Sequence, residues 1–312
     1  MTNRTKQIAT LATVTTLGLL YGRYRQEKKQ ALHTLRKNSQ TIPVKDGVVD
    51  LATQGEGPAV LILHGGGGGY EQGAAIGQLL ELNQHKVISV SRPGHRRTPL
   101  TVGTTLSQQA QLFCDVLDHY QIDKAYIIAM SAGGMSGLQF AIDHPTRCAG
   151  LILLSAQGPS LVQTRPAAYW LWLLNLVLSV GDFPFWLMSK IGLWHLLTTH
   201  MDNNKLHDGP TNGILQGIFP VTDWRDGTLN DLEQLLSLEH MSLESIQVPT
   251  LLAHGDADVI VSHHVAVATQ QRIPHAQLQT IANGSHLMVN THGREIGQIV
   301  TQFMTSAQTT TP

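Results

Sequence analysis

The chain has 312 residues, of which 42% are hydrophobic and 14% are charged, against about 25% charged in ordinary soluble domains, which excludes a disordered or rod-like protein. Its formal net charge of −1 gives no overall attraction for nucleic acid, so we expect no nucleic-acid partner. Cys114 and Cys148 are too few for a disulfide framework and lack zinc-site spacing, so we expect both to be free and buried.

The first 40 residues are predicted to form an apolar segment followed by a polar, basic linker. Residues 8–21 carry no charge, and basic residues such as Lys6 and Arg23 flank them on both sides. As a helix this stretch would span about 21 Å, short of the ~30 Å hydrocarbon core unless the flanking basic side chains reach the interface. Because no small-residue cleavage site follows, we expect an uncleaved membrane anchor. The alternative is a surface helix packed on the body of a cytoplasmic protein.

From residue 41 onward, short apolar runs of strand length alternate with segments of helical pattern. This alternation predicts a mostly parallel sheet with helices on both faces. The expected strands span residues 47–53, 59–64, 86–91, 124–130, 148–155, 250–254 and 276–281. The expected helices span residues 73–83, 105–120, 132–144, 261–273 and 293–306.

Residues 157–248 interrupt the alternation, because they hold no convincing strand and contain all five tryptophans. Their apolar first half is broken by Asp182, Pro184 and Lys190, so no part of it reaches the ~20 residues of a membrane span. A lid of several helices over a cleft fits this composition. The predicted division is an N-terminal segment and linker (1–40), the first part of a core (41–156), a helical cap (157–248) and the second part of the core (249–312).

The segment 126–134 reads YIIAMSAGG, an apolar strand that runs directly into Ser131 and then into small residues. This pattern matches a nucleophile elbow, in which a strained serine lies between a strand and a helix. Such a turn needs small neighbours two positions before and two positions after the serine, here Ala129 and Gly133. Ala129 stands where glycine is more usual.

Five consecutive glycines, residues 65–69, follow His64 at the end of an expected strand. Glycines let the chain present unpaired backbone N–H groups to a developing negative charge. A phosphate-binding loop is the competing interpretation, but Tyr70 breaks the dinucleotide spacing, and no Gly-Lys-Ser/Thr follows as in a Walker loop. We therefore expect an oxyanion loop, whose usual partner is the N–H of the residue after the nucleophile, Ala132.

Two carboxylates, Asp256 and Asp258, lie just past the expected strand 250–254. This is the edge at which parallel sheets place their active sites, and either carboxylate could accept a hydrogen bond from an imidazole. His286 lies in a turn that follows the last expected strand.

These pieces, in the chain order serine, acid, histidine, resemble the α/β-hydrolase superfamily over roughly residues 41–307. The resemblance implies an α/β-hydrolase sheet flanked by helices, with an inserted helical cap. It makes Ser131 the nucleophile and His286 the general base and then acid. It also favours Asp258 over Asp256 as the orienting carboxylate.

The same resemblance implies that Gly66 and Ala132 are the oxyanion donors, with Gly67 as the alternative. His64 and His254 are expected to have structural roles.

The segment from Ser91 to Leu100 is similar to a family loop that ends in the pattern D-x-P-G-x-G-x-S. Here Ser91 and Arg96 replace the customary Asp and Gly.

The implied activity is that of a serine hydrolase which cleaves a carboxylic ester of a small to medium lipophilic acyl substrate through an acyl-enzyme. Trp170 and Trp172 in the apolar cap are expected to contact that substrate, and neither a metal nor another cofactor is expected. One alternative is carbon–carbon bond hydrolysis of a diketone-like substrate by the same triad. Another is a non-catalytic binding protein of the same fold.

Overall fold

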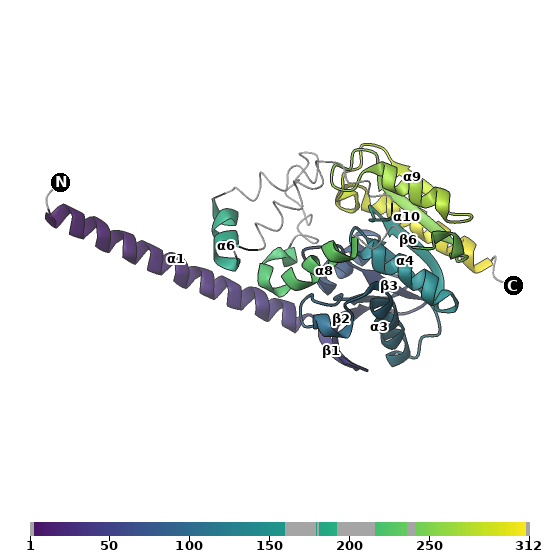
Figure 1. Ribbon diagram of the computed structural model, residues 1–312, viewed down its shortest axis with the longest axis horizontal. Helices are drawn as coiled ribbons and strands as arrows, with labels where there is room; N and C mark the ends of the chain where they lie inside the picture. Colours follow the sequence, from purple (N-terminus) through teal and green to yellow (C-terminus); the bar gives the residue numbers. More distant parts are fainter. Residues whose placement is uncertain (1–2, 160–178, 180, 192–215, 236–240, 310–312) are drawn as a thin grey trace.

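The computed structural model describes residues 3–159, 179, 181–191, 216–235 and 241–309, and its centre is one eight-stranded sheet (Figure 1). The strands are β1 (Gln40–Val44), β2 (Gly47–Gln54), β3 (Ala59–Leu63), β4 (Lys86–Val90), β5 (Ala125–Met130), β6 (Cys148–Leu154), β7 (Thr250–Gly255) and β8 (Gln277–Ile281). They lie in the order β1-β2-β4-β3-β5-β6-β7-β8. The pairs β1/β2 and β2/β4 are antiparallel and the others are parallel, so the predicted mostly parallel sheet is confirmed.

Helices cover both faces of this sheet. They are α2 (Tyr70–Leu79), α3 (Leu106–His119), α4 (Gly133–Asp143), α9 (His263–Arg272) and α10 (Met288–Thr309). One face packs against α3, α4 and α9 through a buried cluster that includes Phe113, Phe140 and Ala266. The other face packs against α2 and α10 through a cluster that includes Ile76 and Ile296. The α/β-hydrolase architecture expected from the sequence is therefore present.

Local sequence explains why most elements form where the pattern predicts them. Every side chain of β5 is buried, as expected for a strand covered on both faces. Helix α3 begins at a capping box, in which the side chains of Thr105 and Gln108 each accept a hydrogen bond from the other residue's backbone N–H.

Strand β1 was not among the expected strands, and it lies at the edge of the sheet. It is short, its burial pattern is mixed, and it contains Pro43, which lacks a backbone N–H and is tolerated in edge strands. A short edge strand of this kind gives no long apolar run to recognise.

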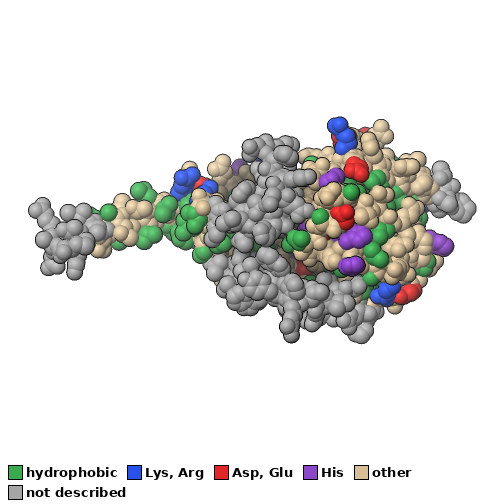
Figure 2. Space-filling model, turned by 90° about the horizontal axis from the view of Figure 1, so that it is seen from above, with side chains coloured by type: hydrophobic (Ala, Val, Ile, Leu, Met, Phe, Trp, Pro, Cys, Tyr) green, Lys and Arg blue, Asp and Glu red, His purple; other side chains and the backbone are tan. Residues whose placement is uncertain are grey.

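The N-terminal segment forms one helix, α1 (Asn3–Lys37), that projects from the body (Figure 1). Residues 26–37, which include the expected linker, continue this helix, because they are mostly strong helix formers and contain neither Gly nor Pro. The projecting half exposes apolar side chains, as Figure 2 shows for part of its surface. These include Leu11, Val14 and Leu17.

The described part of the chain contains no helix that is both long enough and apolar enough to cross a membrane. The expected membrane anchor is therefore not supported. Four threonines and Gly18 dilute the apolar content of residues 8–21, which are in any case fewer than a bilayer core requires.

The C-terminal half of α1 packs against α6 (Asp182–Lys190), which belongs to the expected cap. The Tyr24 side chain is buried, and its ring contacts that of Trp186 with 5.9 Å between centroids. Lys28 forms an ion pair with buried Asp182. Helix α1 is therefore joined to the cap by both apolar and charged contacts.

The described parts of residues 157–248 contain helices joined by loops and no strand. The helices are α6, η4 (Gln216–Ile218), η5 (Val221–Asp223), α8 (Arg225–Leu235) and η7 (Leu243–Ser245). This agrees with the expected helical cap, whose boundaries stay a prediction. Trp170 and Trp172, the expected substrate contacts, lie outside the described residues.

The reactivity of Cys114 and Cys148 tests how closely this core is packed, because both thiols are free and buried. Burial raises the pKa of Cys114 to about 11 and that of Cys148 to about 12. At pH 8 both groups therefore remain protonated and unreactive in the native protein. Titration with a chromogenic disulfide reagent at pH 8 is expected to detect almost no thiol in native protein and both thiols in guanidinium chloride. Rapid reaction of either thiol in the folded protein would contradict this packing.

Candidate active site

Ser131 lies at the turn that joins β5 to α4, and its backbone is strained. Its φ of +50° falls in the left-handed region, which non-glycine residues rarely occupy. The turn is held by the Ser131 N–H, which donates to the carbonyl of Leu154 at 3.1 Å, and by the N–H groups of Gly134 and Gln157, which donate to the Ser131 carbonyl. The side chain is thus presented beyond the carboxyl end of the strand.

Gly133 permits the first turn of α4 to lie against the end of β3. A Cβ atom at this position would lie 2.5 Å from the carbonyl oxygens of both Leu63 and His64. No side chain fits there, which is the physical reason for a small residue two positions after the serine. The contact places the serine turn beside the beginning of the glycine loop.

His286 joins Ser131 and Asp258 in one hydrogen-bonded chain. Its Nε2 lies 3.0 Å from the Ser131 Oγ, and its Nδ1 lies 2.9 Å from the Asp258 Oδ2. The other carboxylate considered from the sequence, Asp256, is exposed, and the structure gives it no contact with His286. His286 is therefore within hydrogen-bond reach of both other residues that the sequence singled out.

The Asp258 carboxylate accepts more than the bond from His286. Its Oδ1 accepts from the backbone N–H groups of Ile260 and Val261 at 2.9 Å each, and its Oδ2 lies 3.2 Å from the Nε2 of His254. Burial alone raises the pKa of Asp258, but the charge of His286 and hydrogen bonds from His254 and His286 outweigh it and hold this pKa well below its usual range. The group is therefore ionised at neutral pH.

The loops that carry Asp258 and His286 meet backbone to backbone. A Cβ atom on Gly255 would clash with the carbonyl group of Gly284. The N–H of Ala257 donates to that same carbonyl at 3.1 Å. The acid loop is thereby fixed relative to the histidine loop before either side chain makes its own contact.

The glycine loop places backbone donors beside Ser131. A Cβ atom on Gly65 would lie 3.1 Å from the Cβ of Ser131. The N–H groups of Gly66 and Ala132 donate to no group in the part of the chain that the structure describes, whereas the N–H of Gly67 faces Thr228 Oγ1 at 3.4 Å. Gly66 and Gly67 were the two loop residues considered as oxyanion donors, and the N–H of Gly66 is thus the one available to a ligand.

Ser91 and Arg96, the two residues that differ from the family pattern in the segment 91–100, each make contacts of their own. Ser91 Oγ accepts the N–H of Tyr70 at 2.9 Å, at the beginning of α2. Arg96 adopts a φ of +56°, as glycine would, while its buried guanidinium bonds to Glu71 and to Asp223 in η5. Arg96 thus ties the core to the cap.

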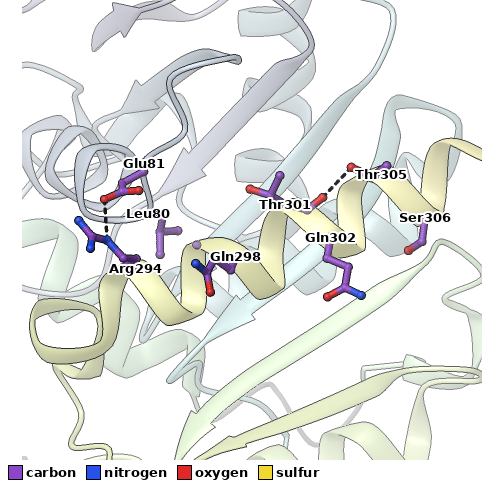
Figure 3. Close-up of a pocket in the computed structure, with 9 residues that line it drawn as sticks. Leu80, Glu81, Arg294, Gln298, Thr301, Gln302, Thr305 and Ser306 are labelled. Atoms are coloured by element: carbon purple, nitrogen blue, oxygen red, sulfur yellow. Dashed lines mark hydrogen bonds and ion pairs between the residues drawn. The ribbon is translucent and has the colours of Figure 1, made fainter.

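The cap contributes residues that lie over the glycine loop. Around Gly67, the nearest atoms that a Cβ would meet belong to Ile218 and Trp224, at 3.8 and 3.9 Å. A separate pocket of about 590 Å³ lies on the outside of α10, near Leu80 and Arg294 (Figure 3). None of its lining residues belongs to the serine–histidine–aspartate chain.

Sequence reasoning missed several contacts that complete the site. Buried Arg92 bonds to the glycine loop and, across the cap boundary, to Asp231. His254 was expected to be structural, yet it also contacts the Asp258 carboxylate. Arg92 lies in the segment that resembles a family loop, but nothing in the sequence signals its partner 139 residues away.

Comparison with known proteins identifies the same fold. A family model described as alpha/beta hydrolase fold matches residues 58–292. The uncharacterized hydrolase YcgS of Bacillus subtilis is 25% identical over 87% of this chain and 100% of its own length. The uncharacterized carboxylesterase nap of the same organism is 24% identical over 67% of this chain and 66% of its own. A 2-hydroxy-6-oxononadienedioate/2-hydroxy-6-oxononatrienedioate hydrolase of Cupriavidus pinatubonensis is 24% identical over 85% of this chain and 95% of its own.

The hydrogen-bonded chain fixes which imidazole nitrogen of His286 carries the proton. Ionised Asp258 can only accept, so the proton lies on Nδ1 and leaves Nε2 unprotonated to accept the Ser131 O–H. We expect ¹⁵N NMR at pH 8 to show the Nδ1–H tautomer of His286, with a strongly downfield N–H proton that disappears in Asp258→Ala. Asp256→Ala is the matched control and should leave both signals unchanged. An Nε2–H tautomer in the wild type would contradict the geometry.

Proposed function

The chain belongs to the alpha/beta hydrolase fold family, and we propose that it is a serine hydrolase that cleaves carboxylic esters of small to medium lipophilic acyl substrates. The observation that carries this proposal is the chain Ser131–His286–Asp258, with contacts of 3.0 and 2.9 Å, at a strained strand-to-helix turn. A serine needs an adjacent base to become a nucleophile, and the base needs a third group to orient it. Both contacts are present.

The proposed reaction begins when His286 Nε2 takes the proton of Ser131 Oγ as this oxygen attacks the acyl carbonyl carbon. The negative charge then moves to the carbonyl oxygen, where the N–H groups of Gly66 and Ala132 can stabilise it. His286 returns the proton to the departing alcohol, which leaves an acyl group on Ser131. A water molecule, deprotonated by His286, then attacks this ester. The bond between the acyl carbon and Ser131 Oγ breaks, the carboxylic acid is released, and His286 returns the proton to Ser131 Oγ.

Asp258 serves this cycle without gaining a proton. Its low pKa keeps it negatively charged while His286 becomes positively charged in each transition state, so the two charges attract most strongly when the barrier is crossed. The backbone donors from Ile260 and Val261 hold the carboxylate in place.

A lipophilic acyl group is favoured by the apolar cap. Ile218 and Trp224 lie next to the glycine loop, and Trp170 and Trp172 are proposed to extend that apolar surface. Similarity to a carboxylesterase supports the ester as substrate. Similarity to the hydrolase of Cupriavidus pinatubonensis, whose named substrates are oxo acids, keeps carbon–carbon bond hydrolysis of a diketone-like substrate as the second candidate, because the same triad could serve it.

We expect a fluorophosphonate probe to label the wild type covalently and to leave Ser131→Ala unlabelled. Ser136→Ala is the matched control, because Ser136 lies on α4, fully buried and hydrogen-bonded to Gln109, and its loss should leave labelling intact. Replacement of Ser131 or His286 by alanine should lower kcat by up to about 10⁶-fold, and Asp258→Ala by about 10⁴-fold. The measurement is steady-state hydrolysis of p-nitrophenyl esters alongside gel-based labelling.

Absence of labelling in a folded wild type would reject the serine hydrolase and favour a non-catalytic binding protein of this fold. Labelling without ester turnover, together with mass-spectrometric detection of two fragments from a diketone, would select the second candidate.

The apolar cap also predicts a dependence on acyl chain length. For p-nitrophenyl esters from acetate to octanoate, kcat/KM should rise by up to about fourfold per added methylene, the equivalent of ~0.8 kcal/mol per buried CH₂. Trp170→Ala and Trp172→Ala should flatten this slope. Trp186→Ala is the control, because Trp186 packs against α1, and it should lower stability without changing the slope. A chain-length profile that neither tryptophan changes would remove them from the substrate site.

A further inference from the structure

Arg92 is a fully buried cation that the reaction described above does not use. Its side chain is 1% exposed and forms a two-pronged ion pair with Asp231 of α8, with both N–O distances 2.6 Å. The same guanidinium donates to the carbonyl oxygens of His64 at 2.9 Å and Gly65 at 3.3 Å. All of its side-chain nitrogens therefore contact either the carbonyls of residues 64 and 65 or the cap.

The contacts of Arg92 fix the orientation of one particular peptide group. The Arg92 backbone N–H donates to His64 Nε2 at 2.9 Å, so the His64 proton lies on Nδ1, from which it is donated to the Gly65 carbonyl at 2.6 Å. Burial holds the pKa of His64 well below its usual range, which keeps this neutral tautomer. The Gly65 carbonyl is thus held by the His64 ring and by the Arg92 guanidinium.

This carbonyl belongs to the same planar group as the N–H of Gly66. In a trans peptide the C=O and N–H bonds point in opposite directions, so a carbonyl that is held on one side aims the N–H to the other side. Gly65 lies against Ser131, as described above. The contacts that fix the direction of the Gly65 carbonyl therefore also fix the direction of the Gly66 N–H beside the nucleophile.

We propose that the Arg92–Asp231 pair is a positioning element of the oxyanion hole, through which docked cap helix α8 sets the direction of the Gly66 N–H. This inference rests on the proposed serine hydrolase function and names a determinant of its transition state. Helix α8 also reaches the loop through Thr228 Oγ1, which faces the N–H of Gly67. The cap thus contacts the peptide group that follows the donor peptide, as well as the residue that orients the donor.

Loss of stability alone cannot test this role, because removal of either partner leaves an unpaired buried charge. The informative variant is the double replacement Arg92→Met/Asp231→Leu, which removes both charges and fills a similar volume. Such replacements are often neutral for stability. Arg92→Lys is the second variant, since it retains the charge opposite Asp231 but loses the forked geometry that reaches the two carbonyls.

We expect both variants to lower kcat for p-nitrophenyl esters by about 10- to 100-fold, less than the 10²–10³ for deletion of an oxyanion donor, with KM changed less than threefold. Affinity for a trifluoromethyl ketone, which forms a tetrahedral oxyanion on the serine, should fall by the same factor as kcat. Affinity for the matching secondary alcohol, which forms no oxyanion, should stay within twofold. Asp50→Asn is the control: Asp50 is buried and paired with Arg97, away from the Gly65 carbonyl, so its loss should lower the melting temperature with kcat unchanged.

A folded double variant with wild-type kcat and wild-type ketone affinity would overturn the proposal. So would a fall in ketone and alcohol affinity by equal factors, because that pattern indicates general damage to the pocket. Failure of the parent hypothesis has a different signature, since the wild type itself would then neither turn over esters nor bind the ketone covalently.

Discussion

No side chain fits between the first turn of α4 and the carbonyl oxygens at the end of β3, and the rest of the site depends on this contact. Because Gly133 allows the helix to lie that close, the strained turn at Ser131 and the loop that begins at Gly65 become neighbours. Backbone atoms alone then set the distance between the serine and the nearest amide donors. A second backbone contact, between Gly255 and Gly284, does the same for the acid and the histidine. Side chains complete a geometry that the main chain has already fixed.

Arginines join this core to the helical segment above it. Arg92 and Arg96 both come from the loop after β4, and each pairs with a carboxylate of the residues 216–235 while also bonding to the core. Arg96 stands where the family pattern has glycine and keeps the left-handed backbone that glycine would supply. That conformation costs a residue with a Cβ of order 1–2 kcal/mol, and the Arg96 side chain forms ion pairs that glycine could not form. Arg96, although it departs from the family pattern, thus attaches the core to the cap.

The sequence was sufficient to predict those elements whose structure is decided by neighbouring residues. Continuous apolar runs identified β3 and β5, and the YIIAMSAGG string placed the turn at Ser131, because strand burial and a tight turn restrict nearby residue types. The order of serine, acid and histidine located three residues that the fold then brought within 3.0 Å contacts. Residues whose partners are distant in sequence gave no such signal. Nothing in the local sequence distinguishes Asp231 from any other charged residue of a helix. Strand β1 and the full length of α1 lack the apolar pattern by which the other elements were predicted.

The attachment of α1 to α6 also constrains the order in which the chain can assemble. Lys28 and Tyr24 are made early during synthesis, but Asp182 and Trp186, their partners, follow about 150 residues later. Closing so long a loop costs entropy that only the later contacts repay. Helix α1 therefore has to wait for its contacts with α6 until the cap has been translated. Its C-terminal half is thus made long before the α6 residues that hold it in place.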